Sequence, residues 1–213
     1  MKSILVIGLG RFGSHLAQKM QDLGNDVMVV DKDPNLVERF AQTFTDSQVA
    51  DCTNERVLQS LGVHHFDICF VCMGSDFQSS LMITAMLKEM KAKYVVAKAS
   101  HAIQADLLER IGADEVVYPE KEMAESLAVR YHVKNIFDYI ELTDAYGIFE
   151  IGVPTSWIGR TIKEIDVRRQ YKVNIIAVKF DDELKVLPGA DYCFKEADHI
   201  MVLGMAVDVD KIS

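Results

Sequence analysis

The sequence predicts an α/β protein in which a doubly wound parallel sheet is followed by a second, smaller α+β domain. From residue 3 to residue 119, short apolar runs alternate with amphipathic stretches of helical period, a pattern typical of repeated βαβ units. After residue 119 the runs are strand-like, with one clear helix among them. A chain of 213 residues is long enough for one standard domain and a small companion.

The first part of the chain holds six predicted strands, with a helix after each of the first five. The strands are expected at 3–7, 26–30, 47–50, 66–73, 94–97 and 115–118. The helices are expected at 12–23, 34–44, 54–61, 77–90 and 103–111. Six parallel strands with helices between them make up a complete Rossmann-type domain.

The second part follows one more helix, expected at 120–131, and a connection at 133–138. Its strands are expected at 139–142, 146–152, 173–180, 184–187 and 199–203, and its one clear helix at 161–171. We therefore predict a Rossmann-type domain with a crossover helix over residues 1–132, and a smaller α+β domain over residues 133–213.

Composition and charge favour a globular, cytoplasmic protein. Apolar residues make up 49% of the chain and charged residues 26%, with a mean hydropathy of +0.07, which is ample material for packed cores. No apolar run reaches the ~18 residues that a membrane helix needs, and the start of the chain leads directly into a strand pattern rather than into a signal peptide. The net charge of −9 opposes binding to nucleic acid, which requires a basic surface.

The cysteines do not form a pattern typical of metal or redox chemistry. Cys52, Cys69, Cys72 and Cys193 are scattered along the chain. Cys69 and Cys72 both lie in the predicted strand 66–73, where residues three positions apart point to opposite faces of the sheet. The sequence therefore predicts that these two are buried strand residues rather than a ligand pair.

A glycine-rich turn follows the first predicted strand and opens the first helix. Gly8, Gly10 and Gly13 form a G-x-G-x-x-G pattern, which in this strand–turn–helix context is a strong indication of a nucleotide site. Gly8 permits the tight turn, Gly10 lets a pyrophosphate approach the backbone, and Gly13 lets the helix pack closely on the sheet. Free amides at the start of the helix would then face the phosphates.

Asp31 and Lys32 bear on the choice of nucleotide. Asp31 follows the second predicted strand, where a carboxylate can accept hydrogen bonds from both ribose hydroxyls of an adenosine; the alternative is a solvated turn residue. A 2′-phosphate would be repelled there, so NAD(H), ATP or ADP is expected rather than NADP(H). The neighbouring Lys32 weakens this exclusion slightly.

Arg11 lies inside the glycine-rich turn and departs from the pattern of dehydrogenases. A cation in the first turn of a helix opposes the helix macrodipole, at a cost of ~0.3–1 kcal/mol. A polyphosphate bound between the two would remove this conflict. The alternative is an arginine that extends into solvent.

Other polar residues follow the carboxyl ends of the remaining strands, which form the ligand edge of an open α/β sheet. They are Asp51, Thr53, Gly74, Asp76, Lys98 and Glu120. As alternatives, Asp51 and Thr53 would cap the next helix, and Glu120 would suit the start of its own helix. Lys98 would place a cation beside a phosphate site.

Residues for catalysis are missing from the sequence. It contains no G-x-S-x-G, no H-E-x-x-H and no Cys/His pair with metal spacing. Only His101 falls near the ligand edge, where we interpret it as a surface or capping residue. Binding without turnover is therefore favoured over an NAD-dependent oxidoreductase, the alternative from another class. A redox-sensing transcriptional regulator is opposed by the acidic charge and by the lack of a basic helix-turn-helix.

Motifs in both predicted domains resemble those of one known family. In the first domain they are Ile7-Gly8-Leu9-Gly10-Arg11-Phe12-Gly13, Val30-Asp31, Asp51-Cys52-Thr53, Val96-Ala97-Lys98-Ala99, Ile111-Gly112-Ala113-Asp114 and Tyr118-Pro119-Glu120-Lys121. In the second domain the motif is the run 167–179. These motifs resemble the RCK or KTN (TrkA-N plus TrkA-C) regulatory subunits of potassium channels and of Ktr/Trk potassium uptake systems.

This resemblance implies a cytosolic subunit of the KtrA type, without a membrane domain of its own. Such subunits assemble from dimers into octameric rings on the inner face of an integral-membrane, potassium-translocating partner. In the family, ATP and ADP, or NADH and NAD, compete for the Rossmann cleft and change the shape of the ring. Glu120 would help to hold Mg²⁺ or another divalent cation near the nucleotides at the dimer interface.

The resemblance also implies roles for individual residues at the cleft. By position, Arg11 would contact the terminal phosphates of ATP, and Asp31 would contact the ribose. Asp51 and Thr53 would lie on the adenine side. Lys98 would lie near the phosphates.

In some members of the family the second domain binds cyclic di-AMP at a symmetric dimer interface. The matching positions in this chain are Ile162, Val167, Arg168, Asn174, Ile175 and Pro188. Apolar side chains with an arginine and an asparagine could stack on a base, meet a phosphate and pair with an adenine edge. The alternative is that Ile162, Val167 and Ile175 are core residues. The family commonly has glycine where Lys172 stands.

Overall fold

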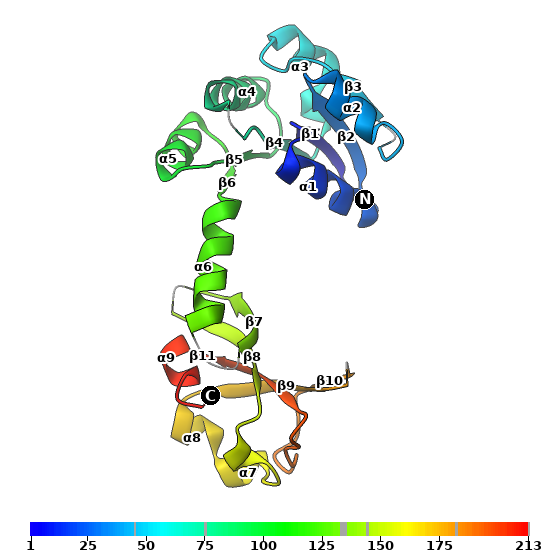
Figure 1. Ribbon diagram of the computed structural model, residues 1–213. Helices are drawn as coiled ribbons and strands as arrows, with labels where there is room; N and C mark the ends of the chain where they lie inside the picture. Colours follow the sequence, from blue (N-terminus) through cyan, green and yellow to red (C-terminus); the bar gives the residue numbers. More distant parts are fainter. Residues whose placement is uncertain (45, 75, 133–135, 144, 182, 213) are drawn as a thin grey trace. The chain divides into compact units, whose positions relative to one another are not determined.

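A six-stranded parallel sheet forms the centre of the first unit of the computed structural model (Figure 1). Its strands are β1 (Ser3–Ile7), β2 (Asp26–Asp31), β3 (Asp46–Val49), β4 (Ile68–Val71), β5 (Val95–Lys98) and β6 (Glu115–Val117). Their order is β3-β2-β1-β4-β5-β6, so the sequence correctly predicts a Rossmann-type sheet. The order reverses between β1 and β4, and ligands bind at such a switch point in doubly wound sheets. The structure describes residues 1–44, 46–74, 76–132, 136–143, 145–181 and 183–212.

Helices cover both faces of this sheet. One apolar core joins the sheet to α1 (Arg11–Asp22) and α2 (Pro34–Phe40). The other core joins it to α3 (Glu55–Leu61), α4 (Phe77–Glu89) and α5 (Ala102–Ile111), with the 3₁₀ turn η1 (Val63–His65) after α3. Cys69 lies in the second of these cores and Cys72 in the first, which confirms that the two cysteines point to opposite faces.

Two predicted elements of the first unit are shorter than expected. The strand predicted at 66–73 pairs with β1 only from Ile68 to Val71. Just before the strand begins, the Asp67 carboxylate accepts a hydrogen bond from the Ser3 amide, 3.0 Å away. The helix predicted at 34–44 ends at Phe40. Phe44 still packs against Phe40, with ring centroids 6.1 Å apart, so the apolar pattern continues although the helix does not.

The second unit is built on a five-stranded antiparallel sheet. Its strands are β7 (Ile136–Glu141), β8 (Gly147–Gly152), β9 (Asn174–Phe180), β10 (Glu183–Val186) and β11 (His199–Gly204), in the order β10-β9-β11-β8-β7. The remaining elements are α6 (Pro119–His132), η2 (Thr155–Trp157), α7 (Ile162–Ile165), α8 (Val167–Tyr171) and α9 (Ala206–Val209). Trp157, Phe149 and Phe194 are almost fully buried at the centre of its core.

Two predictions for the second unit are wrong in detail. The helix expected at 161–171 is two helices, because Asp166 has a left-handed backbone (φ 49°) that interrupts the helical hydrogen bonds. The connection expected at 133–138 already contains the start of β7, since Ile136 pairs with Ile151; residues 133–135 lie outside the described part of the chain.

The chain divides into Met1–Glu120 and Lys121–Ser213, whereas the sequence placed the boundary after residue 132. Most of α6 therefore belongs with the second unit. Its residue Val129 packs against the core of that unit, a contact that helical periodicity alone does not reveal. Among the described residues, no helix combines the length and the apolar composition needed to cross a membrane.

Candidate nucleotide-binding site

The turn between β1 and α1 leaves the start of α1 open. Gly10 is the N-cap, no side chain caps the helix, and the first turn contains no acidic residue. The amides there are consequently free to face an anion. Gly8 has a left-handed backbone (φ 99°), and at Gly13 an added Cβ would overlap the carbonyl oxygen of Gly8. The folded chain itself requires glycine at these two positions.

Gly10 differs from both of these glycines. Its φ is −61°, a value open to any residue, and an added Cβ would meet no atom of the described structure within 4 Å. Nothing in the packing around it demands glycine. A ligand that passes close to the backbone would demand it, because a side chain would then stand in the ligand's path.

The Asp31 carboxylate connects the glycine-rich turn to the end of β2. Its Oδ2 accepts a hydrogen bond from the Leu9 amide at 2.6 Å, and its Oδ1 accepts one from the Asp33 amide at 2.9 Å. Asp31 is thus held by the backbone rather than projecting as a solvated turn residue. Each carboxylate oxygen retains a free lone pair, so the pair of oxygens is presented to the hollow in a fixed orientation.

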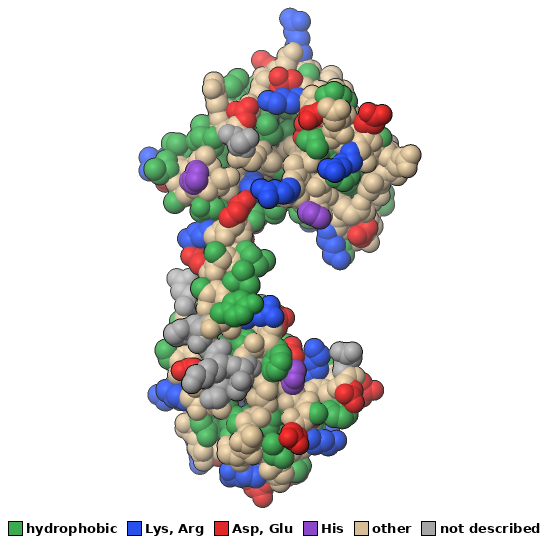
Figure 2. Space-filling model, in the orientation of Figure 1, with side chains coloured by type: hydrophobic (Ala, Val, Ile, Leu, Met, Phe, Trp, Pro, Cys, Tyr) green, Lys and Arg blue, Asp and Glu red, His purple; other side chains and the backbone are tan. Residues whose placement is uncertain are grey.

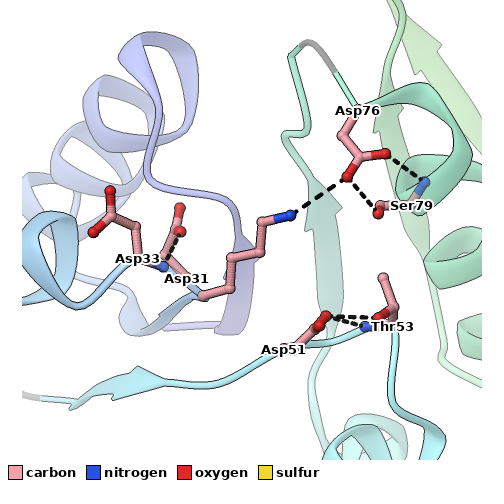
Figure 3. Close-up of polar contacts among 7 residues, drawn as sticks. Asp31, Asp33, Asp51, Thr53, Asp76 and Ser79 are labelled. Carbon is pink, nitrogen blue, oxygen red and sulfur yellow. Dashed lines mark hydrogen bonds and ion pairs between the residues drawn. The ribbon is translucent and has the colours of Figure 1, made fainter.

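Asp51 and Thr53 form a compact polar turn after β3. Asp51 Oδ1 accepts hydrogen bonds from Thr53 Oγ1 at 2.7 Å and from the Thr53 amide at 2.9 Å (Figure 3). These two bonds hold the pKa of Asp51 below its ordinary value. The residue that caps α3 is Asn54, whose side chain accepts from the Arg56 amide. Asp51 and Thr53 therefore do not cap α3.

These groups surround a narrow hollow of about 40 Å³ at the carboxyl ends of the strands. Its lining includes Gly8, Asp31, Lys32, Asp51, Cys52, Thr53, Met73 and Ser79. Burial raises the pKa of the Cys52 thiol to about 12, so this side chain is neutral and apolar at physiological pH. We name this hollow the adenosine hollow, for the ligand that the sequence places there.

A second, wider hollow of about 780 Å³ lies beside the start of α1. Its lining comprises Gly10, Arg11, Phe12, His15, Cys72, Gly74, Lys98, Ser100 and Glu120. The structure thus brings together the residues that the sequence places near phosphate. The sequence did not identify His15 and Ser100 as site residues. The position of His15 on one face of α1 and the position of Ser100 just after β5 are the signals that could have found them. We name this hollow the phosphate hollow.

Lys98 is the most buried charged group of the phosphate hollow, with 8% of its side chain exposed. Its Nζ donates a hydrogen bond to Glu120 Oε1 at 2.6 Å and lies 5.9 Å from the centre of the Phe12 ring. The hydrogen bond from Lys98 lowers the pKa of Glu120, and the nearby charge of Arg11 adds to this effect. Glu120 consequently lies in the first turn of α6 as an ionised carboxylate. His101 is the exposed residue before α5 and lines neither hollow.

The candidate site of the second unit is a separate hollow of about 310 Å³. Five of the six predicted positions line it: Ile162, Val167, Arg168, Ile175 and Pro188. Asn174 is not part of this lining and instead begins β9. Val167 is also a buried core residue, and Ile162 and Ile175 pack against the same core, so these apolar residues serve the fold while they border the hollow.

Comparison with known proteins places both units in one family. Residues 4–119 match the TrkA-N domain model and residues 147–213 match the TrkA-C domain model. The chain belongs to the TrkA-N/TrkA-C family. It is 33% identical to the Ktr system potassium uptake protein C of Bacillus subtilis (strain 168) and 31% identical to protein A of the same system and organism. Each alignment covers 99% of this chain and 95% of the relative.

Solved structures support the same architecture. The GsuK RCK domain superposes with a TM-score of 0.71 at 18% identity over 99% of this chain, which spans 47% of that one. The GsuK channel bound to NAD gives a TM-score of 0.71 at 17% identity, over 99% of this chain and 39% of the other. These likenesses establish an RCK-type fold for this TrkA-N/TrkA-C chain. The relatives that match nearly the whole chain are named potassium uptake proteins, which supports the prediction of a non-enzymatic protein over the oxidoreductase alternative.

Proposed function

We propose that this chain is the nucleotide-gated regulatory subunit of a potassium uptake system. In this proposal, ATP and ADP, or NADH and NAD, bind in the cleft of the first unit and control an integral-membrane, potassium-translocating partner. The subunit itself is cytoplasmic and attached to the inner membrane face through that partner. The observation that carries the proposal is the uncapped start of α1, which faces a hollow containing Arg11 and the buried Lys98.

The charged and polar residues that line the two hollows are of the kinds that an adenine nucleotide requires. The fixed Asp31 carboxylate would receive the ribose hydroxyls, and Asp51, Cys52 and Thr53 would border the adenine. The free amides of α1 would receive the phosphates. Solved neighbours described as GsuK bound to NAD and to ADP support both classes of ligand.

Control of a partner requires that the nucleotides bind two conformations with different affinity. A hundredfold shift in a conformational equilibrium corresponds to about 2.7 kcal/mol of binding preference. Arg11 is exposed at the rim of the phosphate hollow, where it would reach a terminal phosphate that ATP has and ADP lacks. Charge-assisted contacts of this kind contribute roughly 1.5–3 kcal/mol.

The substitution Arg11→Ala tests this assignment. We expect the variant to keep its fold and to lose the difference between its ATP and ADP dissociation constants, measured by isothermal titration calorimetry. Arg110→Ala is the matched control, because this substitution removes the same positive charge at a different place. Arg110 pairs with Asp106 on the exposed side of α5. An Arg11→Ala protein that still distinguishes ATP from ADP as the unmodified chain does would remove Arg11 from the mechanism.

A divalent cation such as Mg²⁺ fits this site only if groups other than the side chains of one chain supply most of its ligands. Glu120 supplies one ionised carboxylate beside the phosphate hollow. The described part of the chain contains no group of three or more acidic, histidine or cysteine side chains that could hold a metal. We therefore propose that Glu120 contributes one oxygen, and that the nucleotide phosphates or a second copy of the chain contribute the others.

A second ligand, cyclic di-AMP, is proposed for the hollow of the second unit. Arg168 would meet a phosphate there, and Ile162, Ile175 and Pro188 would contact a base. Asn174, which begins β9 outside the hollow lining, would pair with an adenine edge from there. Titration of the Arg168→Ala variant with cyclic di-AMP tests this site separately from the nucleotide cleft.

Assembly into a homo-oligomer, an octameric ring of dimers, is also proposed. Hydrophobic side chains gather on the surface of α6 (Figure 2). Met123, Leu127 and Tyr131 recur every fourth residue and are 60%, 40% and 81% exposed, so they form one stripe that a second copy could cover. Native mass spectrometry with each nucleotide and with cyclic di-AMP tests the whole proposal. A monomer that binds none of these ligands would overturn it.

A further inference from the structure

One partner of an exposed ion pair, Lys32, lines the adenosine hollow. Lys32 Nζ lies 3.4 Å from Asp76 Oδ2 and so links the end of β2 to the residue before α4. Figure 3 shows Asp76 and its hydrogen bonds to Ser79. Asp76 is fixed independently, because its carboxylate accepts hydrogen bonds from Ser79 Oγ at 2.7 Å and from the Ser79 amide at 3.1 Å. Lys32 is the more exposed member, with 57% of its side chain exposed against 41% for Asp76.

Lys32 is the one lysine or arginine in the lining of the adenosine hollow, as far as the structure describes it. It directly follows Asp31, whose oxygens face the expected position of the ribose hydroxyls. A phosphate on the ribose 2′-oxygen would stand beside the Asp31 carboxylate and would need a cation to offset the repulsion. Lys32 is the group in that lining that could supply it.

We propose that Asp76 determines which adenine nucleotides enter this site. Asp76 holds Lys32 away from the ribose and adds a second carboxylate near the position of a 2′-phosphate. Nucleotides with a free 2′-hydroxyl, such as NAD(H), ATP and ADP, bind, whereas 2′-phosphorylated NADP(H) is excluded. This inference rests on the proposed nucleotide site. Asp76 acts through Lys32 and is a positioning residue.

The physical basis is that the two classes of nucleotide respond differently to the same pair. An ion pair as exposed as this one is weak, so its loss changes the affinity for a 2′-hydroxyl nucleotide little. A 2′-phosphate carries up to two negative charges and gains both from the released Lys32 and from the removal of the carboxylate. The ratio of the two affinities therefore reports on the pair, whereas a general loss of structure would lower both.

Asp76→Asn tests the inference, because asparagine caps a helix as well as aspartate does and the start of α4 is kept. NADH and NADPH are titrated separately by the fluorescence of the reduced nicotinamide. We expect the dissociation constant for NADPH to fall about fivefold in Asp76→Asn, while that for NADH stays within about twofold. In the double variant Asp76→Asn with Lys32→Gln, the part of the gain for NADPH that comes from Lys32 is lost, and only the smaller part from the removed carboxylate remains.

Asp33→Asn is the matched control. Asp33 caps α2 by accepting a hydrogen bond from the Asn35 amide. This variant therefore removes the same negative charge from the capping position that directly follows Lys32 in the chain. The inference is overturned if Asp76→Asn leaves the ratio of the NADPH and NADH affinities unchanged, if Asp33→Asn raises this ratio equally, or if the whole gain survives Lys32→Gln. A chain that binds neither NADH nor ATP nor ADP would refute the proposed function itself, which is a distinct result.

Discussion

At the scale of single residues, the glycines of the glycine-rich turn differ in why glycine stands at each position. Gly8 and Gly13 are required by backbone conformation and by packing within the chain. Gly10 has an ordinary φ and open space around its Cα. The motif therefore contains two positions where the fold requires glycine and one where it does not, although all three look the same in the sequence.

Alanine substitutions should separate these demands. Gly13→Ala is expected to destabilise the fold by about 3 kcal/mol or more, because its Cβ would overlap the Gly8 carbonyl, which is part of the backbone. Gly10→Ala is expected to leave the free energy of unfolding within about 0.5 kcal/mol of that of the unmodified chain. It is expected to weaken ATP binding by roughly tenfold or more. Thermal unfolding and calorimetric titration of both variants provide the measurement. Equal effects of the two substitutions on stability would refute this division.

At the scale of elements, Asp114 ties together three parts of the first unit. It lies between α5 and β6, and its carboxylate accepts hydrogen bonds from Lys88 Nζ of α4 at 2.7 Å and from the amide of Val95, which begins β5, at 2.7 Å. Burial alone would raise the pKa of Asp114, but the bonds from Lys88 and Val95 outweigh it and the pKa lies below its ordinary value. Asp114 thus stabilises the fold in its ionised form.

The stability that Asp114 contributes should depend on pH with a definite sign. Because its pKa is lowered in the folded state, the contribution is complete above the unfolded value of about 4 and is lost as pH falls through the folded value. Asp114→Asn is expected to lower the free energy of unfolding by about 1–2 kcal/mol at pH 7, and the difference from the unmodified chain should shrink at a pH well below the unfolded value. Urea unfolding at both pH values measures it.

Asp106→Asn is the control for that experiment. Asp106 pairs with Arg110 on the exposed side of α5, and such surface pairs contribute roughly 0–1 kcal/mol. The control should change stability little at either pH. A loss as large as that of Asp114→Asn would mean that charge, and not the three-way connection, is responsible.

The end of α8 predicts a stabilising substitution. Lys172 is the C-cap and has a left-handed backbone (φ 57°), which favours glycine. Lys172→Gly is expected to raise the free energy of unfolding by about 0.5–1 kcal/mol, measured by chemical denaturation. Lys163→Gly, the same change within α7, should instead lower it by about 1 kcal/mol. A destabilised Lys172→Gly protein would contradict the strain inferred at this position.

The sequence predicts the first unit better than the second for physical reasons. Repeated βαβ periodicity fixes the order of strands, and turn residues at the strand ends locate Asp31 and Asp51. The pairing of Lys98 with Glu120 depends on distant segments meeting in space. The break at Asp166 depends on one residue's left-handed backbone, which a helical apolar pattern does not reveal. The ion pair between Lys32 and Asp76 likewise has no signal in spacing.

At the scale of the whole molecule, each unit has its own sheet and its own buried core. The cores of the first unit lie on the two faces of the parallel sheet, and the core of the second unit is formed around Trp157 and Phe149. The adenosine and phosphate hollows are lined by residues of the first unit alone. The hollow bordered by Arg168 belongs to the second unit alone.

Ligands should therefore stabilise the two units separately. Differential scanning calorimetry is expected to show two transitions, and ATP at about 100 times its dissociation constant should stabilise one of them by ~2.7 kcal/mol while the other stays unchanged. Arg11→Ala should reduce that shift, and Arg168→Ala should leave it intact. A single transition, or equal shifts of both transitions with ATP, would contradict this independence.

The uncapped start of α1 also has a practical consequence for work with the purified protein. Inorganic phosphate and sulfate have the charge and size to occupy such a helix terminus. In buffers that contain them, these small anions would compete with a nucleotide bound at the proposed site for the same amides, and the measured affinity would then depend on the buffer as well as on the protein. Comparisons among ATP, ADP and NADH are meaningful only in solutions free of such oxyanions.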